Sequence, residues 1–248
     1  KNDASYHDLY YMNPPAKDLS KIASSDKVKK VQKYFEATHV RPERLMKTLF
    51  TDEAYVKANV DEARLMRRLF DLACNMQSHD TDMQLYSLFT DEECYDLWSC
   101  NNLYWYLTHA CSPVTDGLMP YREADLLRNI LDRADAALKE GKNQATLRFG
   151  HESCLLPLVA LLELNHYGES YPDVEKLSEQ WRAYDIFPMA SNVQFVFFHK
   201  KGSNDVLVKV LLNEKEAKLP VKTDVAPYYH WKDVESYYRE KLDKYQHI

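Results

Sequence analysis

Glycine is scarce in this sequence, with only 5 residues in 248, well below the usual share of about 7%. Enzymes that hold phosphate with main-chain amides use glycine-rich loops such as GxGxxG or GxxxxGK(S/T). Neither pattern occurs in the chain. The composition therefore argues against a nucleotide-binding loop.

Cysteine spacing and hydropathy exclude further classes. The five cysteines form no CxxC pair, which disfavours zinc and thioredoxin-like sites. Because their number is odd, at least one has no partner within the chain, and buried free thiols are the simplest expectation. No apolar run reaches 18 residues and no signal-peptide pattern opens the chain. The first residue is Lys1 rather than methionine, so the missing signal does not indicate a compartment.

Basic residues are outnumbered by acidic ones, and the net charge is −6. Bulk electrostatics therefore do not favour nucleic acid as a partner. An anionic ligand would need a local basic patch. Residues 27–47 provide one, with seven Lys and Arg against two Glu.

The central part of the sequence has helical periodicity. Residues 60–77 and 121–141 place apolar side chains on one face at three-to-four spacing. Thr90 is followed by Glu93 in a capping-box pattern, and Gly141 is a plausible helix C-cap. We expect several packed helices here.

The two ends of the sequence have strand-like patterns. Residues 6–12 are aromatic-rich and predict a short strand, and residues 145–150 predict another that runs into a helix over 153–164. The runs 192–201 and 205–212, separated by a Gly-Ser-Asn-Asp turn, predict a hairpin. Residues 232–245 predict a final helix.

This order of elements predicts an α/β core with a helical domain inserted into it or preceding it. We assign residues 1–24 to a strand and linker of the core, 25–143 to the helical domain, and 144–248 to the remaining core. Three or four strands and two helices after residue 144 make a thin layer for a chain of this length.

The strand-to-helix junction at 150–152, Gly-His-Glu, has the composition of a phosphate site. Ligands of open α/β sheets bind beyond the carboxyl ends of strands, and a helix N-terminus favours anions. Gly150 would permit a sharp turn, a cationic His151 could hold a phosphoryl oxygen, and a protonated Glu152 could give its proton to a leaving alkoxide. The alternative is that Glu152 only complements the helix dipole. Zinc-protease, deaminase and hydrolase-elbow spacings do not fit.

The stretch "LRFGHESCLLPLVALL" resembles the C-terminal signature of the histidine acid phosphatases, especially the multiple inositol polyphosphate phosphatases. The similarity extends over "MPYREADLLRNILDRADAAL" and "NVQFVFFHKKGSNDVLVKVLLNEKEAKLP". The resemblance implies the C-terminal part of a histidine phosphatase α/β core with a large all-helical domain. It also implies hydrolysis of phosphate monoesters through a phosphohistidine, without metal or organic cofactor, and a periplasmic or extracellular location.

Two departures from the family pattern qualify this expectation. None of the nine histidines is followed by glycine, so the family's Arg-His-Gly-x-Arg-x-Pro nucleophile motif is absent. We therefore expect the chain alone to be inactive and to need an N-terminal segment of the same protein; a decayed, non-catalytic phosphate-binding or interaction module is the alternative. The second motif reads His-Glu-Ser, with Glu152 in the place of the aspartate of His-Asp. We assign catalytic roles to His151 and Glu152.

Substrate contacts are expected from the helical domain, which overhangs the active site in this family. Inositol polyphosphates need several cations, and arginine is favoured where bidentate contacts form. We assign substrate binding to arginines of the basic segment and of the next helix, where two lie four residues apart on one face. The residues are Arg41, Arg44, Arg64 and Arg68. A solvated charged face is the alternative. Neither a membrane nor a nucleic acid is expected as a partner.

Overall fold

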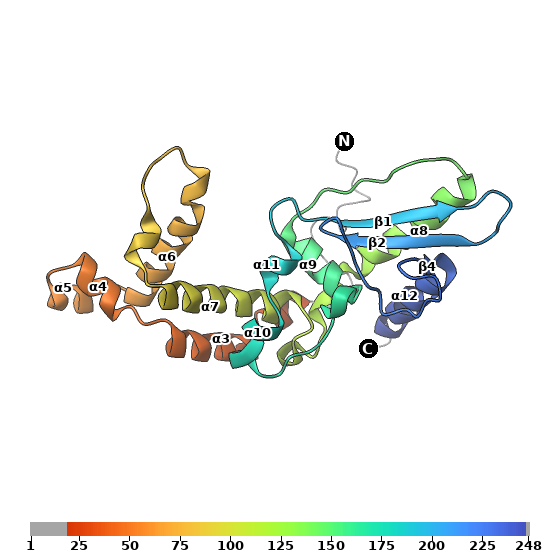
Figure 1. Ribbon diagram of the computed structural model, residues 1–248. Coiled ribbons are helices and arrows are strands. Elements are labelled where there is room, and N and C mark those ends of the chain that lie inside the picture. The colour runs from red at the N-terminus through yellow and green to blue at the C-terminus, as the bar shows by residue number, and fades with distance from the viewer. Residues whose placement is uncertain (1–18, 247–248) are drawn as a thin grey trace. The chain divides into compact units, whose positions relative to one another are not determined.

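The computed structural model describes residues 19–246, and these divide into two compact units (Figure 1). Of these residues, unit 1 comprises 19–28 and 105–246, and unit 2 comprises 29–104. Unit 1 therefore includes the helix over 124–140, which the sequence pattern places in the helical domain. The expected strand at 6–12 lies outside the described residues.

Unit 2 is built from helices and contains no strand among its residues 29–104. Its helices, two of which continue into unit 1, are α3 (Asp26–His39), α4 (Glu43–Leu49), α5 (Glu53–Asn59), α6 (Glu62–Asn75) and α7 (Asp91–His109), with the 3-10 turns η2 (Met76–Ser78) and η3 (Leu85–Leu88). The predicted apolar stripe of α6 packs into the core of this unit through Met66 and Ala73. Leu72 is the exception, since it is 52% exposed.

The capping box predicted at the start of α7 is confirmed. The Thr90 amide donates to the Glu93 carboxylate at 2.9 Å, and the Glu93 amide donates to Thr90 Oγ1 at 3.2 Å. Each bond satisfies a backbone N–H that has no acceptor within the helix. Local sequence thus determines where α7 begins.

Unit 1 combines helices with a small sheet, so the expected mixed α and β fold is confirmed. Its helices are α2 (Leu19–Ala23), α8 (Ala124–Glu140), α9 (Glu152–Leu161), α10 (Leu177–Gln180), α11 (Ala183–Ile186) and α12 (Trp231–Gln246). Its 3-10 turns are η4 (Pro113–Thr115), η5 (Met119–Glu123), η6 (Leu164–His166) and η7 (Val174–Lys176). Gly141 ends α8 in the left-handed conformation (φ 64°), as the sequence predicts.

The sheet is antiparallel throughout. Strands β1 (Val193–His199) and β2 (Val206–Leu212) form the predicted hairpin, with Val193 opposite Leu212 and His199 opposite Val206. Two short strands, β3 (Lys215–Glu216) and β4 (Tyr229–His230), pair with opposite ends of β2. Alternate residues of β2 therefore face the core, where Val208 and Val210 are fully buried.

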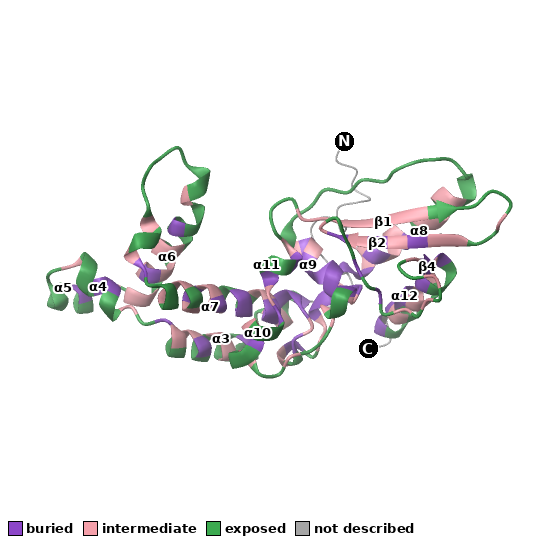
Figure 2. Cartoon of the chain, viewed as in Figure 1, coloured by how far each residue is buried: buried purple, intermediate pink, exposed green. Residues whose placement is uncertain are grey.

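The core of unit 1 gathers around α9, α8 and α12. Helix α9 is apolar on nearly all sides, as expected of a buried helix (Figure 2). Arg239 of α12 pairs with Asp132 and Asp135 of α8 at 2.9 and 2.8 Å, which ties these two helices together. The positions that α9 contributes to the core are Leu156, Val159, Ala160 and Leu161.

The predicted strand at 145–150 is wrong. Residues 143–151 have no regular secondary structure, and residues 141–152 are all exposed (Figure 2). Leu147 and Phe149, two apart as in a strand, are 75% and 80% exposed. Strand-like residues form a strand only where a neighbour supplies hydrogen-bond partners, and no described residue does so here.

Candidate active site

The Gly-His-Glu sequence lies where an extended segment meets the first turn of α9. His151 precedes the helix with extended backbone (φ −112°, ψ 164°). Its carbonyl accepts hydrogen bonds from the amides of Cys154 and Leu155 at 3.0 and 3.1 Å. Glu152 is therefore the first helical residue, at the end of α9 that carries partial positive charge and favours anions.

Both candidate side chains at this junction are exposed to solvent. Neither the His151 side chain nor the Glu152 side chain forms a hydrogen bond or ion pair with another residue in the range 19–246. Gly150 was expected to permit a sharp turn, but its φ is not positive and an added Cβ would meet nothing within 4 Å. The described chain presents an imidazole and a carboxyl side by side without enclosing them.

A buried acid lies against the inner side of this junction. Glu123, the last residue of η5, is only 1% exposed. Its Oε1 has no hydrogen-bond partner among residues 19–246. Burial raises the pKa of Glu123 to about 8, although the positive charge of Arg122 opposes the rise. Glu123 therefore carries a proton at neutral pH.

Glu123 is electrostatically linked to the first turn of α9. Burial, and then the charge of Glu123, raises the pKa of the Cys154 thiol to about 11. Helices α9 and η5 pack directly against each other. The buried acid thus faces the same turn that carries Glu152 on its solvent side.

A buried histidine lies in the same part of unit 1. His109 is 6% exposed, and its Nδ1 lies 2.7 Å from Thr108 Oγ1. Burial, helped by the charge of Arg122, lowers the pKa of His109 to about 4. The ring is therefore neutral over most of the pH range. Arg122 itself donates to the Thr108 carbonyl at 3.5 Å.

Sequence reasoning missed Glu123, although a signal was present. Glu123 precedes Leu127 by four residues and Leu131 by eight, and both leucines are fully buried. A carboxyl at that spacing lies on the apolar face of the helix and is a candidate for burial. Sequence alone gives no indication that its Oε1 would lack a partner.

The four arginines assigned to substrate binding all lie in unit 2. Arg44 is held by Glu93, with Nε and Nη2 at 2.7 and 2.5 Å from the carboxylate oxygens, and it also donates to the Leu88 carbonyl at 2.6 Å. It therefore ties α4 to the capped start of α7. Arg41 lies 4.0 Å from Glu92 with both side chains well exposed.

Arg64 and Arg68 lie on the solvent side of α6, as their spacing predicts. Arg68 forms an exposed pair with Asp71 at 3.4 Å. Arg64 forms no ion pair with another residue in the described range. The neighbouring Arg67 is ion-paired with Glu36 of α3. Arg41, Arg64 and Arg68 are thus exposed, whereas Arg44 is held by Glu93.

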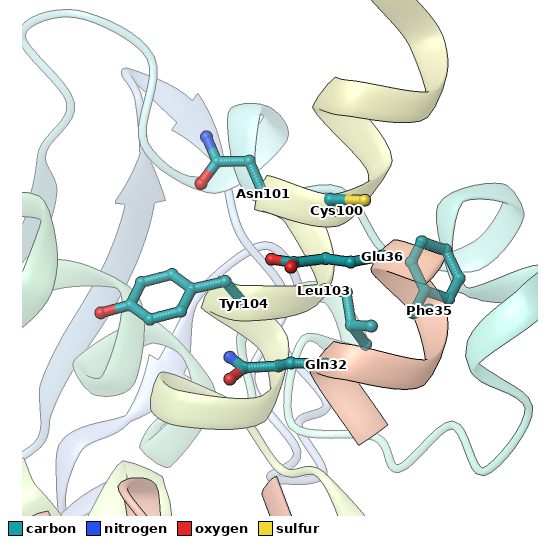
Figure 3. A pocket seen from close by; sticks show the side chains of 7 residues that line it. All are labelled: Gln32, Phe35, Glu36, Cys100, Asn101, Leu103 and Tyr104. Atoms are coloured by element: carbon teal, nitrogen blue, oxygen red, sulfur yellow. The ribbon is translucent and has the colours of Figure 1, made fainter. Parts of the chain in front are cut away.

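Unit 2 contains a cavity of about 220 Å³ between α3 and α7 (Figure 3). Its charged lining residue is an acid, Glu36, and no Lys or Arg lines it. A polyanion would not be favoured there. The lining residues are Gln32, Phe35, Glu36, Cys100, Asn101, Leu103 and Tyr104.

Unit 1 contains a second cavity of about 330 Å³, between η6 and the segment after β3. Of its charged residues, Glu163 is ion-paired with Lys241, and His166 lies 3.0 Å from Glu169. His151 and Glu152 line neither this cavity nor the one in unit 2. The candidate site is therefore an open surface in the described chain.

Metal-binding geometry and membrane spans are absent from residues 19–246. No group of three or more His, Cys, Asp or Glu side chains converges there as metal ligands would. No helix in the same range is long and apolar enough to cross a bilayer. None of the five cysteines forms a disulfide. Of these only Cys154 is buried, and Cys74 is exposed, so the expectation of buried thiols is met at one position.

Comparison with known proteins gives consistent matches. The model of the histidine phosphatase superfamily (branch 2) matches residues 2–213. Multiple inositol polyphosphate phosphatase 1 of Homo sapiens is 28% identical over 134 residues, which is 49% of this chain and 27% of that protein. The family match therefore includes the Gly-His-Glu junction.

Two crystal structures of a Bifidobacterium longum multiple inositol polyphosphate phosphatase share the fold. The complex with phosphate has a TM-score of 0.76 over 95% of this chain and 63% of that one, at 17% identity. The complex with inositol hexasulfate has a TM-score of 0.71 over 92% and 61%, also at 17% identity. The chain spans less than two thirds of the length of these relatives. Because the family match covers most of the sequence, the protein belongs to branch 2 of the histidine phosphatase superfamily.

Proposed function

We propose that this chain is the part of a phosphomonoesterase, acting on inositol polyphosphates, that supplies the proton donor. The main support is that the family match extends over residues 2–213 and contains Gly-His-Glu at the N-terminus of α9. The side chains of His151 and Glu152 are exposed and have no partner in the described chain, which leaves both available to a ligand.

The proposed reaction proceeds in two steps. A histidine of an Arg-His-Gly-x-Arg-x-Pro segment, which this sequence does not contain, attacks phosphorus, and the P–O bond to the inositol oxygen breaks. Glu152 gives its proton to that oxygen, while a cationic His151 and the α9 N-terminus stabilise the phosphoryl oxygens. Water then attacks the phosphohistidine and passes a proton to Glu152, which releases inorganic phosphate.

The Glu152 side chain is one methylene longer than the aspartate found at this position in the His-Asp motif, and its carboxyl must still reach the leaving oxygen. The additional methylene changes its reach by about 1.5 Å, one C–C bond. Exposure at the first position of α9 gives the longer side chain room to adopt the required rotamer. No described residue restrains it.

Substrate phosphates away from the reacting one are proposed to contact Arg64 and Arg68, with Arg41 as a further contact. Their guanidinium groups are exposed. Arg44 was assigned the same role, but a phosphate would have to compete there with the bidentate Glu93 carboxylate. We also propose that a helical domain over 25–143 contributes these substrate contacts.

The alternative function is a non-catalytic phosphate-binding module. It is favoured by one observation, the lack of any His-Gly pair in the sequence. The coding sequence upstream of Lys1 separates the two functions directly. An Arg-His-Gly-x-Arg-x-Pro motif there supports the enzyme, and a start codon immediately before the Lys1 codon supports the module.

The decisive experiment is kinetic. The purified 248-residue chain should release no phosphate from phytate, because it lacks the nucleophile. In the enzyme that contains the nucleophile segment, Glu152→Gln should slow the hydrolysis of phytate much more than that of p-nitrophenyl phosphate. The reason is that the inositol alkoxide is a poor leaving group without protonation, whereas p-nitrophenolate needs little protonation. Equal slowing of both substrates would show that Glu152 is not the donor. A periplasmic or extracellular location is also proposed from the resemblance, and cell fractionation tests it.

A further inference from the structure

The unexplained group nearest the candidate site is Glu123. A carboxyl that is 99% buried normally has hydrogen-bond partners, because leaving a buried acceptor without one costs about 1–3 kcal/mol. Oε1 of Glu123 has none among the described residues. No role for Glu123 follows from the two-step reaction proposed for Glu152.

The position of Glu123 shows what it can influence. It is the last residue of η5, which packs against α9. A negative charge on Glu123 raises the pKa of Cys154 in the first turn of that helix. This turn is closed by the amides of Cys154 and Leu155 on the His151 carbonyl. Among residues 19–246, the amides of Glu152 and Ser153 have no such acceptor, as is usual for a helix start.

Few charges surround this buried acid. Arg122 is its immediate neighbour in η5, and Cys154 faces it from α9. The other elements packed against η5 are α8 and α2. Helix α8 carries Asp125, two residues after Glu123, and α2 carries the exposed Lys21. Among residues 19–246, none of these side chains forms an ion pair with Glu123, so little compensates a negative charge there.

We propose that Glu123 is a positioning residue that couples the order of the first turn of α9 to a proton. While Glu123 is protonated, η5 and α9 remain packed and Glu152 is held at the helix start. When Glu123 releases its proton to water, the resulting carboxylate is stable only if the turn opens and lets water in. The catalytic consequence, loss of the helix turn that carries the proton donor, rests on the proposed function.

Hydrogen exchange on the 248-residue chain tests the structural part without substrate. If opening of the first α9 turn exposes Glu123, the equilibrium constant for opening should rise about tenfold per pH unit between pH 5 and 7. The reason is that Glu123 loses its proton at lower pH in the open form than in the closed form. The protection factors of the Cys154 and Leu155 amides, corrected for intrinsic exchange, should fall accordingly. Glu123→Gln should abolish this pH dependence, and Glu140→Gln, at an exposed position at the end of α8, should retain it.

Two results would overturn the proposal. One is the same pH dependence in Glu123→Gln as in wild type, and the other is no pH dependence in wild type. If the Gln variant does not fold, carbon NMR of the Glu123 carboxyl in wild type decides instead: titration near the ordinary glutamate value refutes the proposal, and titration well above it, together with the exchange result, supports it.

The catalytic part has a separate readout. In the enzyme with its nucleophile segment, Glu123→Gln should increase the phytate activity retained at pH 7 relative to pH 5, whereas Glu140→Gln should not. If exchange behaves as described but Glu152→Gln shows no leaving-group dependence, the proposed function fails and the role of Glu123 in the α9 turn stands. If hydrogen exchange does not show the expected pH dependence, the proposed role of Glu123 is refuted, whatever the kinetics of Glu152→Gln show.

Discussion

Two buried groups near α9 should give the stability of this protein opposite dependences on pH. Burial raises the pKa of Glu123 from 4.5 to about 8, and burial lowers the pKa of His109 from 6.5 to about 4. Folding stability changes by about 1.4 kcal/mol per pH unit wherever one group binds a proton in only one state. The two groups can therefore be separated by their pH windows.

The sign differs for the two groups. For Glu123 the folded state binds the additional proton between pH 4.5 and 8, so stability falls as pH rises through this window. For His109 the unfolded state binds the additional proton between pH 4 and 6.5, so stability rises with pH there. Over the full windows the changes are about 5 kcal/mol for Glu123 and about 3 kcal/mol for His109.

Wild-type protein should consequently show little net change from these groups between pH 4.5 and 6.5, where the two slopes cancel. Between pH 6.5 and 8 only Glu123 contributes, and the free energy of unfolding should fall by about 2 kcal/mol. Glu123→Gln should remove this fall and reveal the rise due to His109. His109→Gln should reveal the fall due to Glu123 from pH 4.5 upward.

The assay is urea unfolding at half-unit pH steps, followed by circular dichroism. The difference in unfolding free energy between wild type and each variant cancels the other titrating groups. Glu140→Gln, the same substitution at an exposed position at the end of α8, is the matched control. The difference in unfolding free energy between it and wild type should not change with pH. A difference curve for Glu123→Gln that stays flat from pH 4.5 to 8 would refute the reasoning.

Three further perturbations test other parts of the structure. Thr90→Ala removes the capping oxygen of α7 and should lower the unfolding free energy by about 1 kcal/mol, measured by urea unfolding; no change would contradict the cap. Gly168→Ala should destabilise by about 1–3 kcal/mol, because the added Cβ would lie 2.9 Å from the Ala160 carbonyl oxygen, and an unchanged melting temperature would argue against this packing. Arg64→Glu with Arg68→Glu should raise KM for phytate in the assembled enzyme far more than for a monophosphate, and equal changes would refute substrate binding by α6.

Elements specified by neighbouring residues were predictable. The β1–β2 hairpin follows from two β-rich runs around a Gly-Ser-Asn-Asp turn, and the start of α7 follows from Thr90 and Glu93. Gly141 ends α8 because glycine adopts a positive φ without strain. Each of these is signalled by residues only a few positions apart, such as a turn or a cap, and such signals can be recognised in a linear pattern.

The candidate site was predictable only in part. His151 and Glu152 were correctly placed at the start of a helix, since the leucine-rich run after them has helical length and composition. The strand expected before them is not formed, because strand pairing depends on a distant neighbour. The role of Arg44 was equally hidden, since its partner Glu93 lies 49 residues away in the chain.

The sequence by itself determined the family, the helix boundaries set by caps and the hairpin, because these depend on local residue identity. Only the tertiary structure decided that Glu123 is buried against the first turn of α9, that Glu93 holds Arg44, and that residues 143–151 form no strand. The physical reason is that burial and pairing depend on which distant segments meet in space. A carboxyl in the sequence has an ordinary pKa until the fold removes the water around it.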